Sequence, residues 1–133
     1  MYNPKMANAK IFKFEMLKVY KSWRNIEVYC PAFKENVYFT LLGWNYIVGN
    51  SKKHRSQSDV YRRLKLLPLA KDIISRSGTI QSIKVVNNIT MYALDSIETI
   101  EVNGVKVTTK IRVIVLQTKS GKKFLSIMDR KIR

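Results

Sequence analysis

Two consecutive arginines in this chain have the residue type and the spacing to bind an anionic group. Arg62 and Arg63 lie in the segment VYRRLKLLP, and a helix turns Arg63 about 100° from Arg62, toward the flank of Leu64. At least one of the two must therefore face whatever this helix packs against. An arginine there can bind a phosphate group through two parallel hydrogen bonds. It can equally lie along the edge of the core with its charge in water.

Arg112 is a third candidate, because it stands in a segment otherwise suited to a central strand. In KIRVIVL it shares one face of the strand with Lys110 and Ile114. A guanidinium in the middle of a sheet is costly to desolvate unless it is paired. We therefore expect Arg112 either to pair with an acid on the neighbouring strand, such as Asp95 or Glu98, or to line a groove as an anion site.

Three further polar side chains could join the same chemistry. Ser126, in the last predicted strand, either fills space or donates a hydrogen bond to a phosphate beside Arg112 on the adjacent strand. Tyr46, which follows Gly-Trp-Asn, is either a core aromatic or a phenol that transfers a proton. His54 is the only imidazole and lies in the basic loop 51–55, where it is either incidental or an acid–base group. The predicted catalytic set is Tyr46, His54, Arg62, Arg63, Arg112 and Ser126.

The charge of the chain points to a polyanionic partner. The 133 residues include 25 Lys and Arg against 9 Asp and Glu, a formal charge of +16. Most of the excess lies in residues 50–76 and 105–133, whereas residues 92–101 hold three acids and no base. Such a domain most often binds nucleic acid, and an anionic membrane surface is the second most frequent partner. The alternative is a lysine-rich surface that is only solvated and has no polyanionic partner. The residues expected to contact the nucleic acid are Lys52, Lys53, Arg55, Lys65, Lys110 and Arg130.

The composition disfavours several other classes of protein. One cysteine, Cys30, and one histidine cannot build a disulfide or a tetrahedral zinc site. No two acids stand two residues apart and no glycine-rich phosphate-binding motif occurs, so we expect neither a metal nor a cofactor. No apolar run reaches membrane-spanning length, and residues 1–13 lack the apolar segment of a signal peptide. We expect action in the cytoplasm without a membrane partner, and delivery from a larger secreted chain stays open.

The elements that must position these residues can be predicted from hydrophobic period and turn signals. Apolar spacing predicts helices, and runs rich in Val, Ile, Thr and Tyr predict strands. Ser56 and Asp59 have the spacing of a capping box, and Asn103-Gly104 is a strong hairpin signal. The predicted helical segments are 12–25, 41–48 and a helix that starts just before Val60, is interrupted at Pro68 and ends by Gly78. The predicted strands are 26–30, 37–40, 79–86, 89–101, 105–117 and 123–128.

This order predicts an α+β fold, with N-terminal helices followed by a three- to four-stranded antiparallel meander sheet. Residues 1–10 are expected to be a flexible N-terminus, and residues 11–133 a single domain. The central expectation is that cations from the helix after residue 56 and from the C-terminal hairpin gather in one concavity.

The order of segments resembles a known superfamily. The runs VYFTLLGWNYI, KHR, VYRRLKLLPLAKDII, MYAL, KIRVIV and KKFLSIMDRK resemble the small phage and toxin nucleases of the barnase/EndoU/colicin/RelE-like (BECR) superfamily, over roughly residues 37–131. The resemblance implies a four-stranded antiparallel sheet whose concave face cleaves RNA without metal. In that reaction the 2′-hydroxyl attacks the adjacent phosphate and leaves a cyclic phosphate and a 5′-hydroxyl. Carried onto this chain, it implies a site of Arg62 or Arg63 with Arg112 and Ser126.

The chain departs from this pattern at one position. Relatives often carry histidine after G-W-x, where this chain has Tyr46, so Tyr46 itself, His54 or a lysine such as Lys65 must move the proton, or activity is lost. We therefore expect a metal-independent, toxin-like ribonuclease acting on RNA such as tRNA. The alternative is a non-catalytic basic nucleic-acid-binding module. An acidic immunity protein or antitoxin is a possible further partner in either case.

Overall fold

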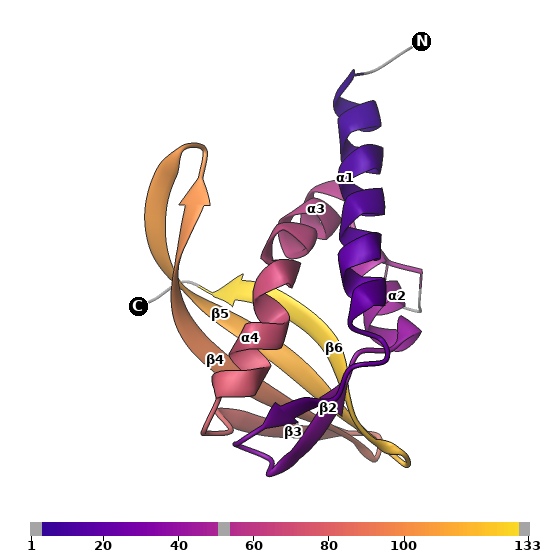
Figure 1. The fold of residues 1–133 in the computed structure, drawn as a ribbon, viewed down its shortest axis with the longest axis vertical. Coiled ribbons are helices and arrows are strands. Elements are labelled where there is room, and N and C mark those ends of the chain that lie inside the picture. The colour runs from indigo at the N-terminus through magenta and orange to yellow at the C-terminus, as the bar shows by residue number, and fades with distance from the viewer. Residues whose placement is uncertain (1–3, 51–53, 131–133) are drawn as a thin grey trace.

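The computed structural model describes residues 4–50 and 54–130, with side chains from residue 8 onward, and has an α+β fold (Figure 1). The predicted class is thus confirmed. Helices and strands follow one another as α1 Pro4–Ser22, β1 Val28–Cys30, β2 Glu35–Tyr38, α2 Leu41–Val48, α3 Gln57–Leu66, the short 3-10 helix η1 Leu67–Leu69, α4 Ala70–Arg76, β3 Ser82–Val86, β4 Ile89–Val102, β5 Val105–Thr118 and β6 Gly121–Arg130.

The sheet is larger than predicted and is mixed rather than purely antiparallel. Among the described residues it has six strands in the order β1-β2-β6-β5-β4-β3. The meander β3–β6 was expected, but the β1–β2 hairpin joins it through a short parallel pairing of β2 with β6, at Val37↔Lys122 and Tyr38↔Lys123. Strands of three and four residues carry too little pattern to predict which edge they pair with. Val37 is fully buried, which explains why the hairpin docks there.

Helix α1 begins earlier than its hydrophobic pattern predicted. Pro4 is its first residue, so residues 4–10, expected to be flexible, are helical. Proline suits the first helical position because it lacks an N–H that would have no partner there and its φ is already helical. The helix ends at Ser22, where the prediction placed the end near Asn25.

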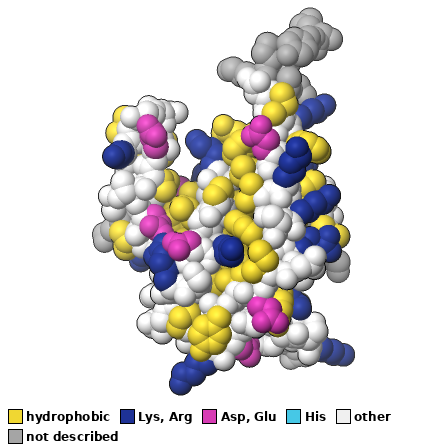
Figure 2. All heavy atoms as spheres, viewed as in Figure 1, with side chains coloured by type: hydrophobic (Ala, Val, Ile, Leu, Met, Phe, Trp, Pro, Cys, Tyr) yellow, Lys and Arg dark blue, Asp and Glu magenta, His cyan; other side chains and the backbone are white. Residues whose placement is uncertain are grey.

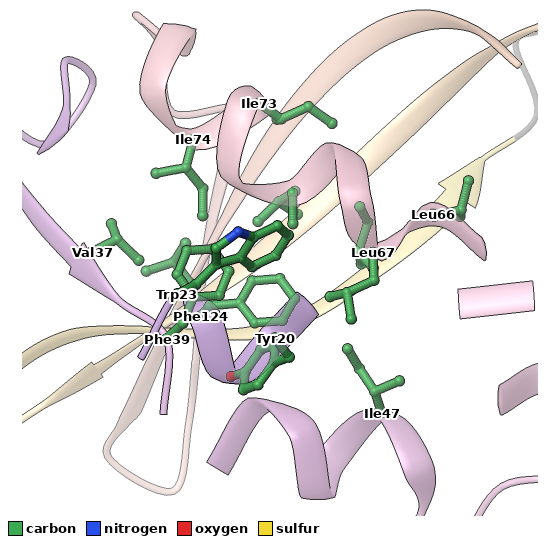
Figure 3. Packing of buried hydrophobic residues seen from close by; sticks show 14 of the residues in the cluster. Tyr20, Trp23, Val37, Phe39, Ile47, Leu66, Leu67, Ile73, Ile74 and Phe124 are labelled. Carbon is green, nitrogen blue, oxygen red and sulfur yellow. The ribbon is translucent and has the colours of Figure 1, made fainter. Parts of the chain in front are cut away.

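The core lies between the helices and one face of the sheet. On β5, Ile111, Val113 and Val115 are fully buried against the helices, so Arg112 between them points to the opposite face. The aromatic rings of Tyr20, Trp23, Phe39 and Phe124 pack together in this core (Figure 3). Tyr20 donates its hydroxyl to the carbonyl of Thr40, and burial raises the pKa of its phenol above the ordinary value.

Gly43 lets α2 approach β6 closely. A Cβ at this position would lie 2.6 Å from the carbonyl oxygen of Phe124 and 2.7 Å from the hydroxyl of Tyr20. Such distances are shorter than carbon atoms tolerate, so only glycine allows this contact. The close packing fixes α2, the helix that also carries Tyr46, against β6.

The β4–β5 hairpin extends beyond the rest of the sheet as an arm (Figure 1). Its turn is the predicted one, since Asn103 and Gly104 have φ values of 52° and 79°. On the face drawn in Figure 2, Lys and Arg side chains are spread out, many of them along α1, and hydrophobic side chains lie along the middle. In the described part of the chain no helix has the length and apolar character needed to cross a membrane.

Candidate functional site

Helix α3 lies against β6 and brings Arg63 onto the last strand. Nη1 of Arg63 donates to Oγ of Ser126 at 2.7 Å and to the carbonyl of Ile127 at 3.3 Å. Ser126 is fully buried, and the Arg63 side chain is only 11% exposed. The pairing of β2 with β6 ends at Lys123, so the rest of this edge of β6 is open to the helices. A residue of the central helix and a residue of the last strand, both predicted as site residues, therefore meet.

Asp59 is the centre of the surrounding charge cluster. Its Oδ2 accepts from Nη1 of Arg55 at 3.0 Å and from Nε of Arg63 at 3.1 Å, and its Oδ1 accepts from Nη2 of Arg62 at 3.0 Å. Its backbone N–H donates to Oγ of Ser56 at 3.2 Å, so the predicted helix cap is confirmed. Burial alone would raise the pKa of Asp59, but the charges of Arg63 and Arg55 and their hydrogen bonds lower it below its ordinary value.

Arg55 links this cluster to helix α2. Its side chain is 3% exposed, its Nε donates to the carbonyl of Tyr46 at 2.8 Å, and its Cζ lies 4.7 Å from the centroid of the Tyr46 ring. Burial and the charge of Arg55 lower the pKa of Arg63, while Asp59 and the Tyr46 phenol act in the opposite direction. Tyr46, Arg55, Asp59, Arg62, Arg63 and Ser126 form what we call the arginine cluster.

Asp129 borders the arginine cluster from the end of β6. Its Oδ1 lies 3.4 Å from Nε of Arg62, whose side chain is 58% exposed. The same oxygen is buried and has no hydrogen-bond partner in the parts of the chain that the structure describes. The sequence analysis did not select Asp129. Its sequence context could have indicated a role, because Asp129 is the single acid in the otherwise basic residues 105–133.

The cluster retains positive charge and free donors. The guanidiniums of Arg55, Arg62 and Arg63 face the carboxylates of Asp59 and Asp129, three positive against two negative charges, which leaves one positive charge. Within residues 8–50 and 54–130, Nη2 of Arg55, Nη2 of Arg63 and Nη1 of Arg62 have no hydrogen-bond partner. The arrangement can therefore donate several hydrogen bonds to one anionic group.

Arg112 does not join the arginine cluster. It lies on the face of the sheet opposite to the helices, and its Nε and Nη2 donate to the two carboxylate oxygens of Asp95 at 2.7 and 2.9 Å. Their side chains are 19% and 8% exposed. Of the two alternatives for Arg112, the ion pair with Asp95 is therefore present. The prediction that Arg112 and the arginines of α3 share one concavity is wrong.

The register of the last hairpin does not keep the two residues apart, because Arg112 pairs with Met128 and Ser126 with Ile114, two positions along the same face. The one-residue register shift lies beyond Ser126, between Ile114 and Val115. The separation follows from their partners, since Arg112 is held by Asp95 of β4 on one side and α3 lies against β6 on the other. The Ser126 hydroxyl meets Arg63 of α3 instead of Arg112 of the neighbouring strand.

The remaining predicted residues are dispersed. His54 is exposed just before Arg55 and takes part in none of the described contacts of the cluster. Lys65 is exposed, with its Nζ 5.4 Å from the centroid of the Tyr61 ring. Lys110 and Arg130 lie with Arg112 beside a pocket on the opposite face of the sheet. Lys52 and Lys53 lie outside the described residues.

The side chains that the structure describes do not suggest a metal centre. Among the described residues, no three His, Cys, Asp or Glu side chains lie together in a way that could hold a metal ion. Cys30 is buried, its Sγ lies 3.8 Å from the carbonyl oxygen of Ser77, and burial raises the pKa of its thiol.

Comparison of this chain with known proteins identified no relative. No protein-family model, no curated protein and no solved structure matches this chain. The interpretation of the arginine cluster therefore rests on its own residues and geometry.

Proposed function

We propose that this protein is a metal-independent ribonuclease whose active site is the arginine cluster. The observation that carries the proposal is the 2.7 Å hydrogen bond between Arg63 and Ser126. It joins the central helix to the last strand and holds a largely buried guanidinium near the Tyr46 phenol. Four of the six residues selected for catalysis, namely Tyr46, Arg62, Arg63 and Ser126, belong to this cluster.

In the proposed reaction the guanidiniums of Arg55 and Arg63 bind the scissile phosphate. As the 2′-hydroxyl attacks, charge builds up on the phosphate oxygens, and donors already fixed by Asp59 stabilise it without reorganising. Asp59 has a lowered pKa, so it stays ionised and positions the two arginines rather than accepting the proton. The Tyr46 phenol donates a proton to the leaving 5′-oxygen, and the exposed imidazole of His54, next to Arg55, accepts the proton of the 2′-hydroxyl.

The test is cleavage of total RNA and of purified tRNA in the presence of EDTA, followed on denaturing gels. We expect RNA fragments to form in the presence of EDTA. We also expect the cleavage rate of Arg63→Lys to be at least about 100-fold lower than that of the wild type, because lysine cannot donate two parallel hydrogen bonds to the phosphate. Arg76→Lys is the matched control, since Arg76 is also paired with carboxylates, those of Asp72 and Glu98, but lies outside the cluster. Cleavage that EDTA abolishes, or equal rates for both variants, would refute the proposal.

The second candidate function is non-catalytic nucleic-acid binding. It is favoured by the pairing of all three guanidiniums of the cluster with carboxylates and by the absence of an imidazole among the described contacts of the cluster. In this case the wild-type protein retards RNA on a native gel in a salt-dependent manner but leaves every strand intact. If a protein partner silences either activity, the net charge of +16 favours an acidic one, in line with the expected immunity protein or antitoxin.

A further inference from the structure

The face of the sheet opposite to the helices contains a pocket that the arginine cluster does not use. Its volume is about 730 Å³, and residues of β4, β5 and β6 line it together with Gln81. Lys110, Arg112 and Arg130 contribute three positive charges, and Asp95 and Asp129 contribute two negative ones.

Both carboxylates of this outer-face pocket already have partners. Asp95 accepts two hydrogen bonds from Arg112, and that pairing raises the pKa of the Arg112 guanidinium above its ordinary value. Asp129 pairs instead with Arg62, which approaches it from the arginine cluster. Neither Lys110 nor Arg130 has an ion pair among the described residues. Two cations at the pocket are therefore without a counter-charge.

These two cations lie directly opposite each other on neighbouring strands. Lys110 of β5 pairs in register with Arg130 of β6, and both share a face with Arg112. Like charges in directly opposed positions destabilise a sheet. An anion in the pocket would lie beside both and remove that repulsion. Arg112, held in place by Asp95, has its Nη1 without a partner among the described residues and can donate to the same anion.

We propose that the outer-face pocket is a second phosphate-binding site, which holds a backbone phosphate of the same RNA strand that the arginine cluster binds. The identity of the ligand as RNA rests on the proposed function. Asp129 lines the pocket and also pairs with Arg62 of the cluster, so the two sites meet at the end of β6. A strand bound at the cluster reaches the pocket by passing around this end.

The first experiment measures binding without cleavage. A fully 2′-O-methylated RNA dodecamer lacks the attacking hydroxyl, and its binding is followed by fluorescence anisotropy at several salt concentrations. The double variant Lys110→Ala/Arg130→Ala is compared with Lys84→Ala/Lys106→Ala, which removes the same charge from exposed lysines on the same face outside the pocket. We expect at least a tenfold loss of affinity and a salt slope smaller by about 1 for the pocket variant, and less than a threefold loss for the control. Equal losses would overturn the proposal.

The second experiment locates the bound phosphate. Inorganic phosphate is titrated into the wild-type protein while backbone amide resonances are recorded by NMR. The proposal expects saturable shifts at residues 110–112 and 128–130 that are absent in Lys110→Ala/Arg130→Ala. Shifts confined to Arg63 and Ser126, or none that saturate, would overturn it. A wild-type protein that shows the pocket shifts but never cleaves RNA refutes the ribonuclease proposal and leaves the phosphate site standing.

Discussion

The charge of Asp59 should be among the most important single charges for folding stability, and Asp59→Asn tests this with almost no change of shape. The carboxylate faces Arg55 and Arg63, whose side chains are 3% and 11% exposed. Removing one partner of a largely buried ion pair typically costs about 3–5 kcal/mol. Since a domain is stable by only about 5–15 kcal/mol, this loss is a large share of the total. We expect the melting temperature to fall by roughly 10 °C or more.

Asp72→Asn is the matched control. Asp72 also stands in the first turn of a helix and pairs with an arginine four residues later, Arg76, but their side chains are 67% and 46% exposed. An exposed pair of this kind contributes about 1 kcal/mol at most. The assay is urea unfolding at pH 7, followed by circular dichroism. If Asp59→Asn lost no more stability than Asp72→Asn, the central role of Asp59 would be refuted.

The pH dependence of the same pair of variants gives an independent check. The pKa of Asp59 is lowered in the folded protein, so its stabilisation is complete above the pKa of the unfolded chain and is lost as the pH falls through the folded value. The difference in unfolding free energy between wild type and Asp59→Asn should therefore be constant near neutral pH and shrink in acid. A difference that stays constant down to pH 2 would contradict the assigned ionic role.

Two further substitutions test the packing and the outer face of the sheet. Gly43→Ala should destabilise the fold by about 1–3 kcal/mol in urea unfolding, because the new methyl group collides with the Phe124 carbonyl, whereas Gly78→Ala, with open space around it, should be close to neutral. Arg112→Ala leaves Asp95, 8% exposed, as an unpaired carboxylate, so it should lower stability by about 3 kcal/mol. Because Arg112 lies outside the arginine cluster, the folded fraction should keep its cleavage rate at saturating RNA. An inactive variant of unchanged stability would instead place Arg112 in catalysis.

The parts of the fold that local chemistry determines were predictable from the sequence. The turn at Asn103-Gly104 requires positive φ, and the cap at Ser56 requires a side-chain acceptor, so both show in the residue types. Arg63 and Ser126 were both selected as site residues, but the contact between them was not predicted, because the expected neighbour of Ser126 was Arg112.

The parts that depend on long-range geometry were not predictable. Arg112 is held by Asp95 of β4, and Arg63 reaches Ser126 from α3. These contacts decide which arginine the serine meets, and the spacing of residues in the sequence does not reveal them. The convergence of three arginines on Asp59 needs Arg55 to fold back onto the carbonyl of Tyr46, which sequence spacing does not reveal. The parallel pairing of β2 with β6 joins segments more than 80 residues apart, Val37 with Lys122.

The most direct test of the ribonuclease proposal is to identify the chemical groups at the ends of the RNA fragments that the protein produces. Wild-type protein and Arg63→Lys are incubated with tRNA in EDTA, and the fragments are analysed by mass spectrometry. The account predicts 2′,3′-cyclic phosphate and 5′-hydroxyl ends with wild type and intact tRNA with the variant over the same time. Intact tRNA with both proteins, or fragments with 5′-phosphate ends, would contradict it.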